Sequence, residues 1–136
     1  CVNGPYNFVG DGNVEQWVGT LEEARRLGAR VVCPGHGVRG EGDLLDAQQD
    51  FFKGLRQEVG VLVKQRKSAA EIRDSVNAIR DQLAKNARAA RYVSKGTLSG
   101  QVEKVLNEMT GQNFPDEGKT SGSARLWHAA HHGVLG

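Results

Sequence analysis

The sequence predicts an α/β fold, and three stretches of the chain carry that prediction. An amphipathic helix is expected over about 13–27, a short buried strand over 30–33, and a series of amphipathic helices from residue 43 onward. A helix that leads into a short buried strand is typical of helices layered on a sheet. We therefore expect a layered α/β region followed by a helical region.

The first helix is predicted from its two ends and from its apolar face. Asn13 is a favourable N-cap residue, and Gln16 stands three positions later, where a capping box has its second member. Trp17, Leu21 and Ala24 recur at helical spacing, and Val14 and Leu27 extend this apolar stripe at its two ends. Gly28 is expected to end the helix in a left-handed conformation.

The run from Val31 to Cys33 predicts the strand because β-branched and small apolar residues favour buried strands. Pro34 and Gly35 should end it abruptly. His36 then lies on a turn between two glycines. Imidazole is a frequent metal ligand, and the end of a strand holds a side chain rigidly. His36 is therefore a candidate metal ligand, and the alternative is an ordinary polar turn residue.

Beyond a glycine-rich loop, the chain is predicted to form three longer helices. The first starts at Asp43 and runs for about five to six turns. Ser68 and Glu71 form a capping box that opens the second, and the third is expected over about 97–110. Each helix has an apolar stripe, which we interpret as packing surface. The stripes are Leu45, Phe52, Leu55, Val59 and Leu62; then Ile72, Val76, Ile79 and Leu83; then Leu98, Val102, Val105 and Met109.

Length and composition place this chain among single domains or parts of one. Its 136 residues suffice for one domain, but the hydrophobic content of 38% and aromatic content of 6% are low for a full core. The chain starts at Cys1 rather than Met, so we interpret it as part of a longer protein. Two cysteines do not make a disulfide framework, which favours a reducing compartment, and a cytoplasmic location is expected.

Charge is distributed unevenly along the chain. Residues 1–50 carry eight acidic and four basic side chains, whereas residues 51–104 carry five acidic and twelve basic ones. We interpret the basic half as the solvated faces of helices, since no aromatic residues are interleaved for base stacking. No apolar run is long enough to cross a membrane. Neither a nucleic acid nor a membrane is expected as a partner.

Four segments together resemble the C-terminal half of a metallo-β-lactamase-fold hydrolase. They are Gly4-Pro5-Tyr6-Asn7, Gly10-Asp11-Gly12-Asn13, the helix with Trp17 and Leu21, and the run Val31-Val32-Cys33-Pro34-Gly35-His36-Gly37. The resemblance implies an αββα sandwich with a zinc site, often of two ions. The implied activity is attack by zinc-bound hydroxide on an ester, thioester or related bond of a small-molecule substrate.

Within this resemblance, His36 corresponds to the last zinc ligand. The His-x-His-x-Asp-His motif that supplies the other ligands is absent, so this chain alone is expected neither to hold zinc tightly nor to catalyse hydrolysis. Two sources for a further ligand stay open: Cys1 as a thiolate, or an Asp just before Cys1. Asp11 is interpreted as a turn residue. His128, His131 and His132 would share one helix face, but we interpret them as part of a frayed tail.

These interpretations divide the chain into three parts. Residues 1–42 are assigned to the metallo-β-lactamase-like domain, residues 43–114 to a helical extension, and residues 115–136 to a flexible tail. An alternative function comes from the helices themselves. Residues 43–114 would then form a non-catalytic module for dimerisation or partner binding, and the oligomeric state stays open.

Overall fold

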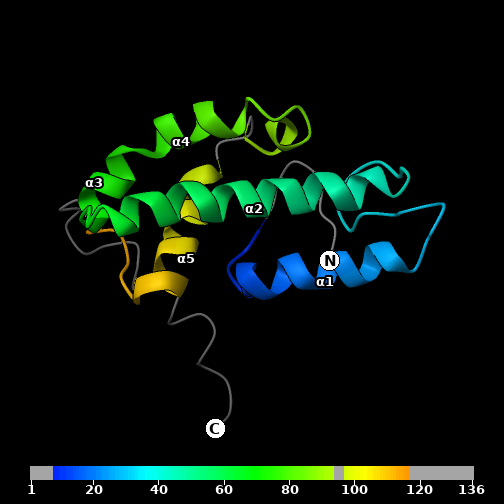
Figure 1. Ribbon diagram of the computed structural model, residues 1–136, viewed down its shortest axis with the longest axis horizontal. Helices are drawn as coiled ribbons and strands as arrows, with labels where there is room; N and C mark the ends of the chain where they lie inside the picture. The colour runs from blue at the N-terminus through cyan, green and yellow to red at the C-terminus, as the bar shows by residue number, and fades with distance from the viewer. Residues whose placement is uncertain (1–7, 94–96, 117–136) are drawn as a thin grey trace, which may run out of the picture.

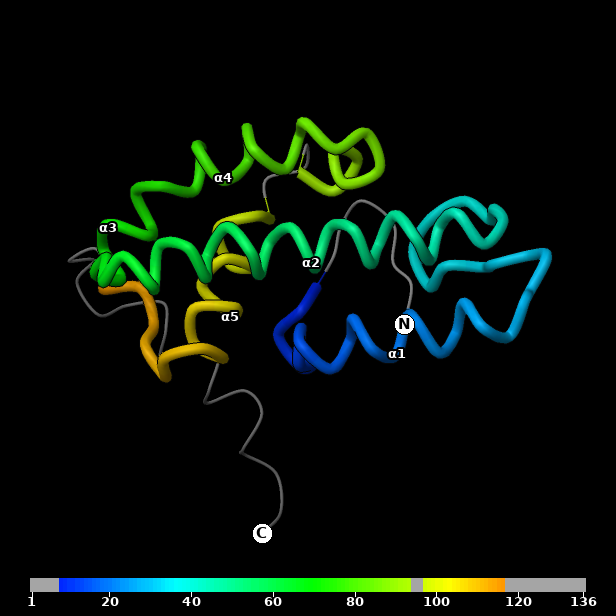
Figure 2. The backbone as a smooth tube through the Cα atoms, in the orientation of Figure 1, coloured from blue at the N-terminus to red at the C-terminus, as the bar shows by residue number. Residues whose placement is uncertain are grey.

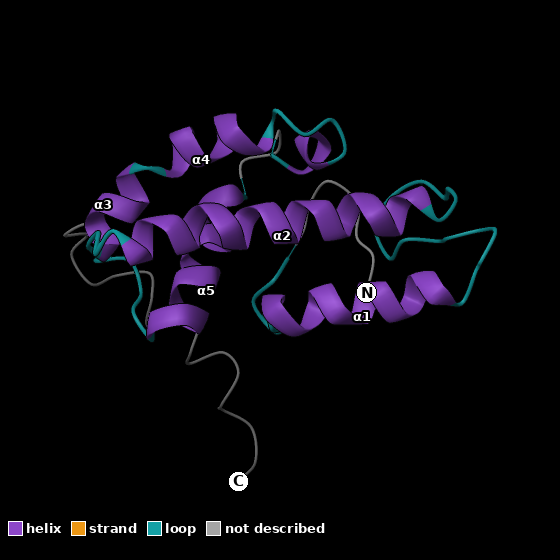
Figure 3. Ribbon diagram, in the orientation of Figure 1, coloured by secondary structure: helices purple, strands orange, loops and turns teal. Residues whose placement is uncertain are grey.

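The computed structural model describes residues 8–93 and 97–116, and this part of the chain is all-α. Figure 3 shows helices joined by loops, with no strand drawn among these residues. The elements are α1 (Val14–Arg26), α2 (Asp43–Lys64), α3 (Ala69–Asp74), α4 (Val76–Leu83), the 3₁₀ helix η1 (Ala89–Tyr92) and α5 (Leu98–Thr110). None of the helices in the described ranges is both long and apolar enough to cross a membrane.

The prediction of an α/β fold is wrong. The expected strand over 30–33 is reduced to a single antiparallel bridge between Val32 and Gly40. A strand is stable only beside a neighbouring strand, and the described residues that follow fold into helices instead. Only Val32 of the run is buried, whereas Val31 and Cys33 are exposed. The expected αββα sandwich is therefore absent from the described residues.

The long helix α2 lies at the centre of the fold. Figure 1 shows α1 along one side of α2 and the pair α3 and α4 along the other. The last helix, α5, contacts all four of the other α-helices. Buried side chains from all of these elements form one hydrophobic cluster, so each predicted stripe faces the interior.

Three aromatic contacts run through the centre of this cluster. The ring of Phe52 lies 5.0 Å from that of Trp17 in α1 and 5.5 Å from that of Phe51. Phe51 in turn lies 5.2 Å from the ring of Tyr92 in η1. These distances fall in the range of favourable aromatic pairs. Burial raises the pKa of the Tyr92 phenol.

The predicted Asn13 cap and the glycine that ends the first helix are confirmed. The side-chain oxygen of Asn13 accepts a hydrogen bond of 2.8 Å from the backbone N–H of Gln16. At the other end, Gly28 has φ +65°, the left-handed conformation that glycine adopts at low cost.

A residue distant in the sequence caps the N-terminus of α1 with a hydrogen bond. Oε1 of Glu108, in α5, accepts a 2.8 Å hydrogen bond from the backbone N–H of Val14. Its carboxylate also lies 3.7 Å from the guanidinium of Arg56, which pairs with Glu15 at 3.4 Å. A carboxylate at a helix N-terminus satisfies unpaired N–H groups and complements the helix dipole. Glu108 thereby joins α1, α2 and α5.

The second predicted helix is present but interrupted. Ser68 and Glu71 form the expected capping box, in which the Ser68 N–H donates to Glu71 at 2.8 Å. That backbone hydrogen bond, followed by the Lys67 ammonium, lowers the pKa of Glu71 from 4.5 to about 2. The helix breaks at Ser75, whose hydroxyl donates to the Glu71 carbonyl at 2.7 Å. Such bonding of a serine to the preceding turn bends helices, which accounts for the division into α3 and α4.

Candidate functional site

Most residues of the connection between α1 and α2 are exposed. Residues 27–42 link the two helices, a longer link than the two to eight residues usual between packed helices. Figure 2 shows this connection extending past the end of α1, at the right of the view. Loops of this length without helices or strands of their own are usually functional when they are ordered.

The connection is nevertheless held in a defined shape. Val32 and Gly40 each donate a backbone hydrogen bond to the other, at 2.8 and 3.0 Å. At its base, Nε of Arg25 lies 3.0 Å from Oδ1 of Asp46, which ties the end of α1 to the start of α2. The side chain of Arg25 also fills the space that a Cβ on Gly42 would need.

His36, the residue predicted to bind a metal, lies on the turn enclosed by this bridge. Both His36 and Cys33 are exposed, and Gly37 beside them has φ 144°. In the ranges 8–93 and 97–116, no group of three or more His, Cys, Asp or Glu side chains is placed to hold a metal ion. Cys1 and the histidines at 128, 131 and 132 lie outside the described residues.

Exposed apolar side chains gather in the connection. Among the described residues, five large hydrophobic side chains are exposed, and three of them belong to it: Leu27 (83%), Val31 (57%) and Val38 (85%). The connection is less than a sixth of the described chain. Single exposed hydrophobic residues are ordinary, and three of them in one short segment make the connection a candidate interaction site.

Two of the four arginines in and beside the connection are not paired with a carboxylate of the described residues. Arg25 is neutralised by Asp46, and Arg26 lies within 3.0 Å of both Glu22 and Glu23. Arg30 and Arg39 are exposed, and neither forms an ion pair with another described residue. The connection therefore offers two unneutralised guanidinium groups next to its apolar side chains.

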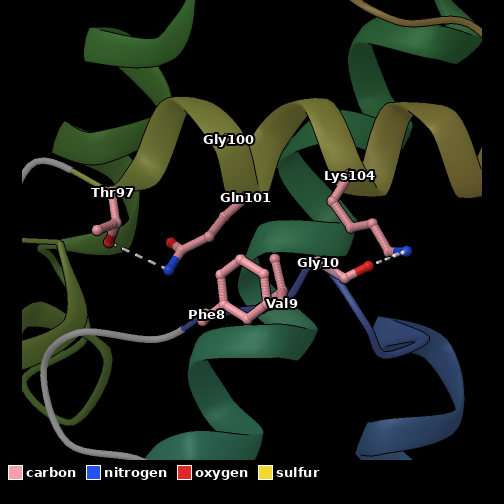
Figure 4. A pocket seen from close by; sticks show the side chains of 7 residues that line it. All are labelled: Phe8, Val9, Gly10, Thr97, Gly100, Gln101 and Lys104. Carbon is pink, nitrogen blue, oxygen red and sulfur yellow. Dashed lines mark hydrogen bonds between the residues drawn. The ribbon is translucent and has the colours of Figure 1, made fainter. Parts of the chain in front are cut away.

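A hollow lies between residues 8–10 and the start of α5 (Figure 4). It has a volume of about 290 Å³, and its walls are mainly apolar. Lys104 donates to the Gly10 carbonyl at 3.1 Å, and the Gln101 amide donates to the Thr97 hydroxyl at 3.3 Å. The Lys104 ammonium and the Gln101 amide N–H are thus engaged within the protein, and the mainly apolar walls offer a ligand apolar contact. It is lined by Phe8, Val9, Gly10, Thr97, Gly100, Gln101 and Lys104.

Sequence reasoning singled out the turn at His36 but missed the apolar exposure around it. Val31 was expected to be buried in a strand, and Leu27 was expected to extend the apolar stripe of the first helix. Both are exposed instead, and no prediction was made for Val38. The length of the connection between the two predicted helices was the available signal. The hollow at α5 had no signal, because residues distant in the sequence form its walls.

Comparison of the chain with known protein families, characterised proteins and solved structures gives no match.

The resemblance to metallo-β-lactamase-fold hydrolases is therefore wrong. The described residues form an all-α fold without a sheet, and no family match supports the resemblance. The expectations of zinc, of hydrolysis and of His36 as a ligand came largely from that resemblance. His36 is exposed, and these three expectations stay predictions, because nothing in the described residues tests them.

Proposed function

We propose that this chain is a helical module that binds a partner protein through the connection at residues 27–42. The observation that carries the proposal is the exposure of Leu27, Val31 and Val38 on a segment whose base and bridge fix its shape. Binding at a shaped loop loses less conformational entropy than binding at an unstructured one. Loops carried on a rigid scaffold are also a frequent location of binding sites.

The packing of the helices supports this choice of surface. The alternative function drawn from the sequence leaves the stripes over 43–114 available to a partner, because the sequence shows little sign of a core to receive them. Nearly all of their residues are instead buried in the cluster around α2, and Leu62 and Met109 pack at its edge. A partner would therefore find apolar surface on the connection rather than on the helix faces that contribute to the core.

A selection experiment tests the proposal. Random peptides are displayed and selected on the immobilised chain, and the selected peptides are then measured against the double variant Leu27→Gln, Val38→Gln. The proposal predicts that they lose most of their affinity for this variant. The matched control is Val61→Gln, which makes the same kind of change at a 44% exposed residue of α2. Selected peptides that bind all three proteins equally would contradict the proposal.

A further inference from the structure

The bridge pairs only one edge of the short extended segment around Val32. The opposite edge of that segment has no backbone partner among the described residues. Val32 and Gly40 exchange both of their hydrogen bonds, so these two residues face each other across the bridge. Backbone groups of successive residues in an extended segment point to opposite edges. The N–H and C=O groups of Val31 and Cys33 consequently point away from Gly40. Neither residue makes a backbone hydrogen bond to another part of the chain that the structure describes.

We propose that this edge binds an extended, acidic segment of a partner protein by strand addition. The inference rests on the proposed function and specifies its mode. An exposed strand edge is a template for pairing with another chain, because its backbone groups lack partners. Exposed Val31 and Cys33 side chains would lie beside apolar residues of the added segment, which gives the pairing an apolar face as well.

Charge favours an acidic partner over a second copy of this chain. Arg30 directly precedes the open edge, and the antiparallel register places Arg39 opposite Cys33. The connection itself contains a single carboxylate, Glu41. Two copies paired at this edge would bring guanidinium groups together, whereas carboxylates on a partner would neutralise them.

A peptide titration followed by NMR tests this proposal. The probe is a short synthetic peptide in which valine alternates with glutamate, and the matched control replaces glutamate with lysine. The glutamate peptide should shift the amide signals of Val31 and Cys33 and slow their hydrogen exchange. The lysine peptide should bind at least about tenfold more weakly. Failure of the glutamate peptide to bind at this edge would overturn strand addition.

Two kinds of variant separate the contribution of backbone hydrogen bonds to binding from the contribution of side chains. Val31→Pro removes one N–H donor and should weaken binding about fivefold or more, whereas Val31→Thr keeps the donor and the β-branched shape and should change affinity less than about twofold. Because proline can disturb the loop, a peptide with N-methylated valines provides the same test with the protein unchanged. Arg30→Glu with Arg39→Glu should reverse the preference in favour of the lysine peptide.

The outcomes distinguish this inference from the proposed function. Selected peptides that depend on Leu27 and Val38 but bind equally well to Val31→Pro would overturn strand addition and leave the proposed function in place. Selected peptides that do not depend on the connection would overturn both. If the chain self-associates and Val31→Pro abolishes this association, the edge is occupied by a second copy. That result would overturn the proposal of an acidic partner.

Discussion

The helices around α2 and the connection at 27–42 use apolar residues in opposite ways. Phe51, Phe52 and Leu55 are completely buried by neighbours from other helices, whereas Leu27 and Val38 are more than four-fifths exposed. Both regions are ordered, the first by packing and the second by a backbone bridge and an ion pair. Apolar residues in the bundle therefore stabilise the fold, whereas those of the connection stay at the surface, where we propose that they bind a partner.

The largest effect should come from truncating the centre of the bundle. Phe52→Ala removes a fully buried ring that contacts Trp17 and Phe51, and it should lower the free energy of unfolding by about 3–5 kcal/mol. Val61→Ala, in the same helix but half-exposed, should change it by less than about 0.5 kcal/mol. Urea denaturation measures both. Similar values for the two variants would contradict the packing described for α2.

The contact at the start of α1 should give the next largest effect. Glu108→Ala leaves the Val14 N–H without its acceptor and removes the carboxylate beside Arg56, so a loss of about 2 kcal/mol is expected. Glu22→Ala removes an exposed pair with Arg26 and should cost less than about 0.5 kcal/mol. If thermal or urea unfolding shows equal losses, Glu108 does not join the helices as described.

Gly19 offers a smaller change, in the stabilising direction. It lies inside α1, and a Cβ there would meet nothing within 4 Å. Gly19→Ala should therefore stabilise the chain by about 0.5–1 kcal/mol through helix propensity and a restricted unfolded chain. Gly54 provides the contrast, because a Cβ there would lie 2.8 Å from the Leu83 side chain. A gain at Gly54 that matches the gain at Gly19 would show that α2 and α4 are not closely packed.

The smallest effect concerns the pH dependence of the capping box. Glu71 has a pKa lowered from 4.5 to about 2, so its contacts stabilise the folded chain above about pH 4.5 and stop doing so as the pH falls toward 2. The difference in unfolding free energy between the natural chain and Glu71→Gln should shrink over that interval. A difference that is independent of pH would argue against the Ser68 and Lys67 contacts.

Local features of this fold were predictable from sequence, and long-range ones were not. The Asn13 cap, the Ser68 capping box and the helical stripes depend on residues within a turn or two of each other, and the structure confirms them. The Glu108 cap of Val14 joins positions 94 residues apart, and no local pattern marks it.

The strand prediction failed for a related reason. The apolar run at Val31 and Val32 satisfies the composition of a strand, but a strand also needs a neighbour, which composition does not supply. The described chain provides only Gly40 as a partner. The same missing neighbour leaves Val31 exposed and produces the open edge, so the failed prediction and the candidate site have one physical cause.

The unfolding free energy of the double variant Leu27→Gln, Val38→Gln tests the central claim most directly. Because these side chains are exposed in the connection, the account predicts a change of less than about 0.5 kcal/mol relative to the natural chain. A loss of about 2 kcal/mol or more would place both side chains in the chain's own core. That result would contradict the claim that the connection is an interaction surface.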